Sequence, residues 1–210
     1  MGIPIDIPGL DVIIPEVQEG RTVLVESGAD LTNSFLVRRL SLAAMRTGHP
    51  VTFVTSRDAK ELRQSLQANG EGSGGAAGHE PRVVEADTVK ELASFTPEGG
   101  MLAVDSFSFL TLDLDAQALA GLLRELHAAC RFRRATAVLA TDRGMFEPRS
   151  EAIAIHIADG YLQFHAREGT DGLVRFLRIP KWTDGKFFDR NIYYEFDGKR
   201  LAIDLRSRVM

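Results

Sequence analysis

The stretch VLVESGADLTNSFLVRRL, residues 23–40, joins a short apolar run to a polar loop and the start of a helix. The run RTVLVE, residues 21–26, is rich in valine, as expected of a strand that is buried on both faces. From about Ser34, apolar side chains recur at helical spacing, and Gly48 stands where a left-handed C-terminal cap belongs. The apolar stripe consists of Leu36, Leu40, Ala43 and Ala44. The stretch therefore predicts a strand, a loop and a helix in succession.

The same alternation continues along the chain. Further buried strands are predicted in PVTFVTS (50–56), PRVVEA (81–86), GMLAVDSFSF (100–109) and ATAVLATD (135–142). The helices predicted between them are DAKELRQSLQANG (58–70), the short DTVKELASF (87–95) and DLDAQALAGLLRELHAACRF (113–132). Strands that alternate with helices indicate a mainly parallel sheet with helices on both faces, an α/β fold.

The pattern changes beyond residue 142. The segments DGYLQFHARE and GLVRFLRIPK flank the turn GTDG, and NIYYEF and KRLAIDL flank DG. Apolar segments that are joined by such short turns are typical of β-hairpins. We therefore predict that antiparallel hairpins extend the parallel sheet at its C-terminal side.

Length and composition limit the class of protein. The 210 residues, 44% of them hydrophobic, predict one domain over residues 1–210, with the Gly-rich segment 70–80 as a flexible loop inside it. The net charge of −4 argues against a protein that binds nucleic acid through bulk charge. The single cysteine, Cys130, excludes an internal disulfide and a multi-cysteine metal site, and no metal site is expected. No apolar run reaches the roughly 18 residues that span a bilayer, so we expect a soluble, cytoplasmic protein without a membrane partner.

A strand–loop–helix followed later by a buried strand that ends in Asp105 is the layout of a P-loop NTPase, in which that aspartate helps to hold Mg²⁺. The chain as a whole resembles the KaiC and RadA branch of the RecA-like ATPases. Gly9, Leu10, Asp11 and Gly20 are in register with the entry segment of that branch. The similarity continues in the same order through GHPVTFVTS, MLAVDSFSFL, TAVLATD, IADGYLQF, VRFLRIPKW and YYEFDGKRLAI. The resemblance implies a RecA-like fold.

The phosphate-binding loop departs from the family motif, G-x-x-x-x-G-K-[ST]. In the equivalent window, Ser27 and Thr32 occupy the glycine positions, Asn33 the lysine position, and Ser34 keeps the hydroxyl that would contact Mg²⁺. A register shifted by one residue does not restore the lysine. A charge-assisted hydrogen bond is worth about 1.5–3 kcal/mol, so the loss of the lysine alone predicts a roughly ten- to hundredfold weaker affinity for nucleotide. Asp30 adds a negative charge to the loop.

Two further parts of the catalytic apparatus differ from the resembled family. Where its members carry a carboxylate pair after the second strand, this chain has Arg57 and Asp58. Where they carry a Lys-x-Arg element that reaches the nucleotide of a neighbouring subunit, it keeps Lys181 but has Thr183 in place of the arginine. We therefore interpret the chain as a RecA-like protein with a degenerate Walker A motif. It is expected to be a non-hydrolysing regulatory or assembly subunit, not an enzyme, in a homo- or hetero-oligomer of RecA-like subunits.

The residues of the vestigial nucleotide and Mg²⁺ site are then Thr32, Asn33, Ser34 and Asp105, with Lys181 as a contact between subunits. No catalytic residue and no cofactor is expected. A first alternative retains weak ATP or ADP binding with Mg²⁺, or ATP hydrolysis, through Ser34, Asp105 and a neighbour's Lys181. A second is a RadA-like nucleic-acid module that uses RFRR (131–134) or the Gly-rich loop.

Structural roles also account for the same residues. Asn33 and Ser34 are good N-terminal helix residues, and Asp105 is able to cap backbone amides at the end of its strand. The RFRR segment suits the negative end of a helix as a solvated patch. Trp182 is either packed on the sheet or exposed as an anchor for a partner.

Overall fold

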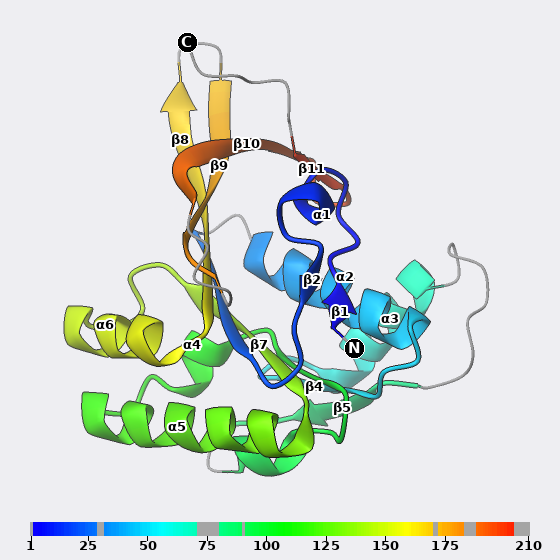
Figure 1. Ribbon diagram of the computed structural model, residues 1–210, viewed down its shortest axis with the longest axis vertical. Coiled ribbons are helices and arrows are strands. Elements are labelled where there is room, and N and C mark those ends of the chain that lie inside the picture. Colours follow the sequence, from blue (N-terminus) through cyan, green and yellow to red (C-terminus); the bar gives the residue numbers. More distant parts are fainter. Residues whose placement is uncertain are drawn as a thin grey trace.

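The computed structural model describes residues 2–28, 32–70, 80–89, 91–169, 172–182 and 188–203. A sheet of nine strands runs through this part of the chain, in the order β11-β10-β9-β8-β3-β7-β6-β4-β5 (Figure 1). The parallel strands are β3 (Thr22–Ser27), β4 (Val51–Thr55), β5 (Arg82–Glu85), β6 (Met101–Val104) and β7 (Thr136–Asp142), and β8 (Gly160–Gly169) also pairs in parallel with β3. The predicted mainly parallel α/β sheet is confirmed.

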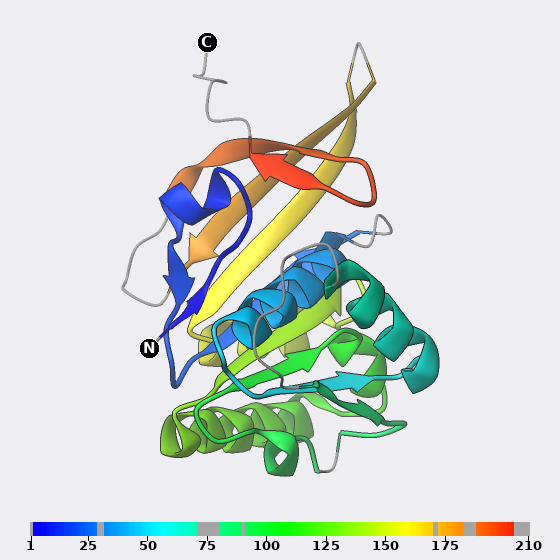
Figure 2. The same ribbon diagram turned by 90° about the vertical axis from the view of Figure 1, so that its right-hand side faces the viewer.

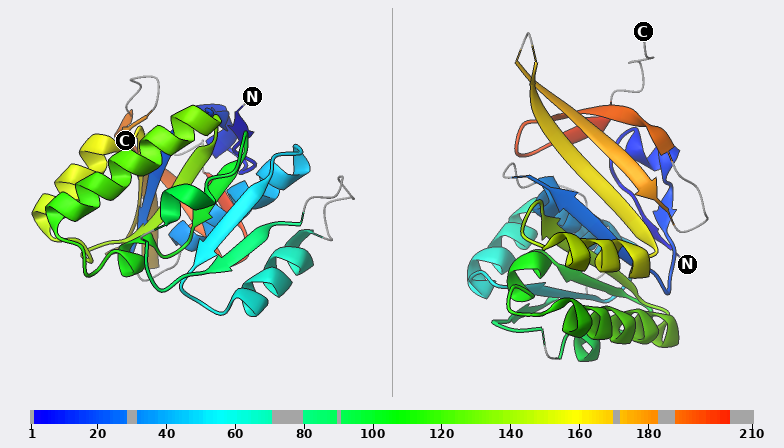
Figure 3. Two further views of the ribbon diagram at one scale, coloured as in Figure 1. Left: turned by 90° about the horizontal axis from the view of Figure 1, so that it is seen from below. Right: turned by 90° about the vertical axis from the view of Figure 1, so that its left-hand side faces the viewer.

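The central strand β3 shows why the sheet is covered on both faces. Val23 and Val25 belong to one hydrophobic cluster, and Leu24, which points the other way, belongs to a second. The first cluster lies under α2 (Thr32–Arg46) and α3 (Ala59–Gly70), and the second under α4 (Phe107–Leu110), α5 (Ala116–Arg133) and α6 (Pro148–Ile157). The two helical layers lie on opposite sides of the strands (Figure 3). The apolar run of β3 is therefore explained, because its successive side chains pack against helices on opposite faces of the sheet.

Helix α2 follows the predicted pattern closely. The predicted stripe of Leu36, Leu40, Ala43 and Ala44 is buried. Gly48 has a φ of 80°, its N–H donates to Met45 O at 3.0 Å, and the N–H of His49 donates to Ala44 O at 2.9 Å. The glycine ends the helix because an L side chain rarely adopts a positive φ.

The C-terminal strands form the predicted antiparallel extension. β8 pairs with β9 (Gly172–Lys181), β9 with β10 (Phe188–Phe196) and β10 with β11 (Leu201–Ile203). In Figure 2 the β8–β9 hairpin extends away from the helices. Trp182, at its base, has an exposed fraction of 5% and is packed on the sheet, as the first of its two predicted roles requires.

Several elements were not predicted. In the segment expected to be a helix over residues 87–95, the described residues, which exclude residue 90, form the 3-10 turn η1 (Leu92–Phe95) and no longer helix. Helix α6 was missed because in the sequence its few apolar residues stand among polar ones. It also follows β7 directly, where the alternation of strands and helices gives way to hairpins. Helix α4 (Phe107–Leu110) was not predicted, because the sequence analysis ended the strand at Asp105 and assigned no helix to the residues that follow. At the N-terminus, β1 (Ile3–Pro4) pairs with β2 (Glu16–Val17), and α1 (Leu10–Ile13) lies between them.

The N-terminal segment also covers an edge of the sheet. The N–H of Ile203 in β11 donates to Pro8 O at 3.1 Å. The next residue, Gly9, has a φ of 84°, and a Cβ on it would lie 2.8 Å from Ile203 Cβ. Close approach and the positive φ both require glycine here.

None of the described helices is long and apolar enough to cross a membrane. Most of the predicted loop, residues 71–79, lies outside the described residues. That residues 1–210 form a single domain stays a prediction.

Candidate functional site

The residues of the predicted vestigial site come together where β3, β6 and β7 end, which we call the carboxyl edge. Thr32, Asn33 and Ser34 form the first turn of α2, and Asp105 follows β6 directly. Their exposed fractions are 0, 1, 2 and 3%, respectively. Four of the five predicted residues are thus brought to one place, and they are almost fully removed from solvent.

Asn33 uses its whole side chain within the protein. Its Nδ2 donates to Thr141 O at 2.7 Å and to Asp142 Oδ1 at 3.2 Å, and its Oδ1 accepts the N–H of Ser34 at 2.7 Å. The amide therefore links the start of α2 to the end of β7. This is the position at which the resembled family has its lysine.

The backbone amides of the first turn of α2 are bonded internally as well. The N–H of Asn33 donates to Ser27 Oγ at 3.3 Å, and the N–H of Ser34 is held by Asn33 Oδ1. The first amides of a helix have no partner inside the helix and commonly bind anions. Here two of them already have protein oxygens as partners.

Asp105 is the least satisfied of the predicted residues. Its N–H donates to Val54 O at 3.2 Å and its Oδ1 accepts from Ser106 Oγ at 3.1 Å, but its Oδ2 has no hydrogen-bond partner among the described residues. The hydroxyl of Ser34 donates to the Asp105 backbone carbonyl at 3.3 Å, not to the carboxylate. A buried oxygen without a partner is unfavourable, so Asp105 is the side chain here that has most to gain from a cation.

Arg38 lies near enough to Asp105 to interact with its charge, and the sequence analysis missed this arginine. Burial lowers the pKa of Arg38, on α2, while the charge of Asp105 raises it and that of Arg57 lowers it. The Nε of Arg38 has no hydrogen-bond partner among the described residues. Arg38 lies four residues after Ser34, so helical spacing alone could have placed it on the same face of α2.

Asp142, which ends β7, is a further site residue that the sequence analysis overlooked. The hydroxyl of Ser108 donates to its Oδ2 at 2.9 Å and accepts its N–H at 3.1 Å, and Asn33 donates to its Oδ1. Both carboxylate oxygens therefore have partners. The available signal was that β7, like β6, is a buried apolar strand followed by aspartate.

Comparisons with known proteins agree with this geometry at the level of the fold. The model of a family of unknown function, DUF7125, matches residues 17–209. The chain belongs to this family. No curated protein sequence matches it significantly.

Two solved structures resemble this DUF7125 protein over nearly its whole length. The KaiC-like protein PH0186 of Pyrococcus horikoshii OT3 has a TM-score of 0.75 and 19% identity, and the match covers 97% of this chain and 99% of that one. The flagellar accessory protein FlaH of Methanocaldococcus jannaschii has a TM-score of 0.75 and 13% identity, with 98% and 100% covered. The fold of the DUF7125 protein is therefore RecA-like, as the sequence predicted.

Beside Ser27, the DUF7125 protein contains a buried charged network that the sequence analysis did not predict. Glu26 is 5% exposed; its Oε1 accepts from Arg143 Nε at 2.8 Å and its Oε2 from Tyr161 Oη at 2.7 Å. Gln163 Nε2 donates to Tyr161 Oη at 2.8 Å. Burial raises the pKa of Tyr161, and its hydrogen bond to Glu26 raises it further, so the hydroxyl remains a donor.

Arg143 connects three strands around this network. Besides the bond to Glu26, its Nη2 donates to Phe164 O at 2.8 Å and its backbone N–H to Ser27 O at 2.9 Å. Arg143 therefore holds the end of β3, where the loop begins, through both the side chain of Glu26 and the backbone carbonyl of Ser27. Burial lowers the pKa of the neighbouring His165, and the charge of Arg143 lowers it further.

The remaining predicted residues have other surroundings. Lys181 Nζ donates to Ile155 O at 3.1 Å and to His156 O at 2.9 Å, so within this chain it caps α6 and lies apart from the buried cluster. Asp58 caps α3, because its Oδ1 accepts the N–H of Lys60 at 2.7 Å. Arg57 is exposed.

Two of the predicted departures, Asp30 and Thr183, lie outside the described residues. Cys130 is buried, and burial raises the pKa of its thiol to about 12, so it remains a protonated core residue at neutral pH. Among the described residues, no group of three or more His, Cys, Asp or Glu side chains is arranged to hold a metal ion.

Proposed function

We propose that this chain is a RecA-fold subunit that does not hydrolyse nucleotide and acts by contact, as a regulatory or assembly component. One observation carries the proposal: the amide of Asn33, at the lysine position, is bonded to Thr141 O, Asp142 Oδ1 and the Ser34 N–H. A phosphate group would have to break these bonds and would meet no ammonium group in return. Each bond contributes roughly 1 kcal/mol, and a buried group left without a partner costs about 1–3 kcal/mol.

The candidate Mg²⁺ ligands support the same proposal. Magnesium is usually bound by one or two carboxylates together with substrate phosphates and water. Asp105 and Ser34 would supply such ligands, and the Ser34 hydroxyl, which donates its proton to the Asp105 carbonyl, keeps its oxygen lone pairs for an ion. Without a held phosphate, these two side chains are too few to retain the ion. Mg²⁺ alone is therefore expected to bind weakly.

A contact role requires an interaction surface, and the carboxyl edge offers apolar side chains for one. Phe109 is 55% exposed and Leu112 is 51% exposed, and both lie in or just after α4, the helix that also carries Ser108. Exposed aromatic side chains are enriched in protein interfaces. We infer that another RecA-like subunit, either a second copy of this chain or a related one, binds at this edge.

Calorimetric titration of ATP and ADP with Mg²⁺ into the purified protein tests the nucleotide part of the proposal. We expect no binding at micromolar concentrations and no phosphate release above background. Low-micromolar binding would contradict the proposal. Asn33→Lys, compared with the native chain, would show whether an ammonium group alone restores affinity; circular dichroism of both proteins establishes that the variant is folded.

Size-exclusion chromatography with light scattering tests the assembly part. We expect an oligomer at micromolar concentration that Phe109→Asp shifts towards the monomer. Phe132→Asp, which changes an exposed phenylalanine at the other end of the molecule, is the matched control and should leave the oligomer intact. A native chain that is monomeric with and without nucleotide would contradict self-association.

A second candidate function, ATP binding or hydrolysis through a non-standard loop, is favoured by the unpartnered Oδ2 of Asp105. It would require Lys181 to leave the carbonyls at the end of α6 and to reach a neighbouring subunit. Phosphate release that Asp105→Asn abolishes would establish this function and exclude the first.

A further inference from the structure

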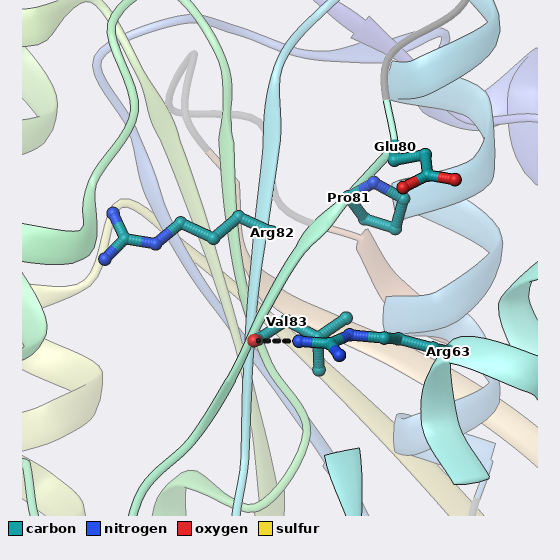
Figure 4. A pocket seen from close by; sticks show the side chains of 5 residues that line it. All are labelled: Arg63, Glu80, Pro81, Arg82 and Val83. Carbon is teal, nitrogen blue, oxygen red and sulfur yellow. Dashed lines mark hydrogen bonds between the residues drawn. The ribbon is translucent and has the colours of Figure 1, made fainter. Parts of the chain in front are cut away.

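Three hollows follow the opposite side of the parallel strands, where these strands begin, which we call the amino edge. The first, of about 250 Å³, lies beside the start of β3 and is lined by Glu19, Gly20, Arg21, Arg131 and Arg134. The second, of about 350 Å³, lies at the starts of β4 and β5 and includes Arg82, Phe95 and Arg133 in its lining. The third, of about 230 Å³, lies beside β5 and is lined by Arg63, Glu80, Pro81, Arg82 and Val83 (Figure 4).

The charged residues that line these hollows are mostly arginines. The described linings contain six arginines, Arg21, Arg63, Arg82, Arg131, Arg133 and Arg134, against two glutamates, Glu19 and Glu80. The whole chain, in contrast, has a net charge of −4. Positive charge is thus concentrated at the amino edge, as expected of a surface that binds an anionic partner.

Only part of this charge is neutralised by nearby carboxylates. Arg134 pairs with Glu19 at 2.6 Å, and Arg21 pairs with Asp159 at 3.1 Å. Arg133 Nη1, in contrast, donates to the carbonyl oxygens of Ser94 and Thr96, which carry no formal charge.

Arg63 and Arg82 extend the positive charge along β5. Arg63 Nη2 donates to Val83 O at 3.2 Å, again a neutral carbonyl, and in Figure 4 Arg82 points away from Arg63 on the other side of the strand. Arg82 also lies over the Phe95 ring, with its guanidinium carbon 5.5 Å from the centroid. Arg82 lines both the second and the third hollow, so it connects the two.

The three hollows lie one after another along the amino edge of the sheet, and we call this row of hollows the path. β3, β7, β6, β4 and β5 are neighbours in this order, so the path crosses four interstrand steps of about 4.8 Å, or about 20 Å. At the rise of about 3.4 Å for each stacked nucleotide, that length accommodates roughly six nucleotides.

An exposed aromatic side chain stands between two of these arginines in the sequence. Phe132 is 85% exposed, in the last turn of α5, between Arg131 in the first hollow and Arg133 in the second. An exposed phenylalanine of this kind contributes nothing to a core. Aromatic side chains between basic ones bind single strands by stacking on a base while the arginines bind phosphates.

We propose that the amino edge binds single-stranded nucleic acid, with Phe132 stacked on a base and the arginines of the hollows on successive phosphates. A flexible strand is able to follow hollows on both sides of a protruding helix end, which a rigid duplex cannot do. An acidic peptide would match the charge, but it has no flat base to cover Phe132. The proposal does not depend on the function proposed for the carboxyl edge.

Fluorescence anisotropy with a labelled single-stranded RNA or DNA of about twelve nucleotides tests the proposal, between about 50 and 200 mM salt. We expect the logarithm of the binding constant to fall with the logarithm of salt concentration with a slope of about −3, because about −0.7 is expected for each phosphate contact and two of the six arginines, Arg134 and Arg21, are already paired with carboxylates. Arg131→Gln should weaken binding and make the slope shallower by about 0.7. Phe132→Ala should weaken binding roughly 5- to 100-fold and leave the slope unchanged.

Matched controls separate this site from general charge effects. Arg124→Gln removes another exposed arginine of α5 that lines none of the three hollows, and Leu173→Ala removes an exposed apolar side chain of β9 that also lines none of them. Both should bind like the native chain. No binding at about 50 mM salt, or equal losses for Arg124→Gln and Arg131→Gln, would overturn the proposal. Equal affinity for a duplex, or full competition by an acidic peptide of the same charge, would overturn it as well.

Discussion

At the carboxyl edge, polar side chains of distant segments bond to one another, whereas at the amino edge arginines line open hollows. Asn33, Asp142 and Glu26 are almost enclosed by their partners from β7, α4 and β8. Arg131 and Phe132, in contrast, are exposed at the end of α5. In a RecA-like fold the carboxyl edge would be the expected place for a ligand, and among the described residues several polar side chains there are bonded to one another. The difference suggests that binding function has to be sought where the side chains remain free.

The largest effect is expected from the Glu26–Arg143 ion pair of the carboxyl edge, in which the carboxylate is buried and the guanidinium is partly exposed. Arg143→Ala leaves Glu26, whose side chain is 7% exposed, without its cation, and should lower the free energy of unfolding by about 3 kcal/mol. Urea unfolding measures this loss. Arg134→Ala, which breaks the exposed pair with Glu19 at the amino edge, should cost less than about 1 kcal/mol. Equal losses of unfolding free energy in the two variants would show that ion pairs at the two edges do not differ in their contribution to stability.

Asn33→Ala should lower the free energy of unfolding by about 2 kcal/mol. The reason is that Thr141 O and the Ser34 N–H, both in buried residues, lose their partner. The control is Asn191→Ala, an exposed asparagine of β10, for which a change below about 0.5 kcal/mol is expected. An Asn33→Ala protein as stable as the native chain would mean that the Asn33 amide is not needed to hold the start of α2 against the end of β7.

A smaller effect should appear as a dependence of stability on pH. Because burial lowers the pKa of folded His165, the unfolded chain binds a proton more readily. The contribution of His165 is therefore complete above its unfolded pKa of about 6.5 and is lost as the pH falls below that value. Urea midpoints at about pH 7.5 and 5.5 should differ less in His165→Gln than in the native chain. An unchanged difference would assign the dependence to other groups.

The smallest change is expected at the amino edge. Arg131→Gln and Phe132→Ala each alter an exposed side chain, and each should change the free energy of unfolding by less than about 0.5 kcal/mol. Thermal unfolding followed by circular dichroism measures this. A large loss of unfolding free energy in either variant would show that these side chains of the amino edge stabilise the fold. The contrast with the carboxyl edge would then be weaker.

The sequence predicted the elements whose pattern is local. The valine-rich run of β3, the stripe of α2 and the cap at Gly48 each depend on neighbouring residues, and all are present in the structure. Helix α4 follows the predicted end of its strand at Asp105 and has only four residues, which are too few to show a helical period in the sequence.

For the candidate site, the sequence predicted which residues come together but not which groups they bond to. Thr32, Asn33, Ser34 and Asp105 could be aligned with a motif, but the two acceptors of Asn33 Nδ2 lie more than a hundred residues away in the sequence. Glu26 and Arg143 are likewise 117 residues apart, and neither belongs to a motif. Hydrogen bonds between distant segments are set by how the strands are ordered in the sheet, which periodicity does not reveal.

The contact between Pro8 and Ile203 has a consequence for the behaviour of the chain in solution. A terminal strand of a sheet has free backbone groups that can recruit a strand of another molecule, and β11 is such a strand. The carbonyl of Pro8 occupies one of its donors. A chain without residues 2–17 would leave that donor free and would also lose buried core side chains such as Ile5 and Leu10, so we expect it to aggregate more readily than the native chain.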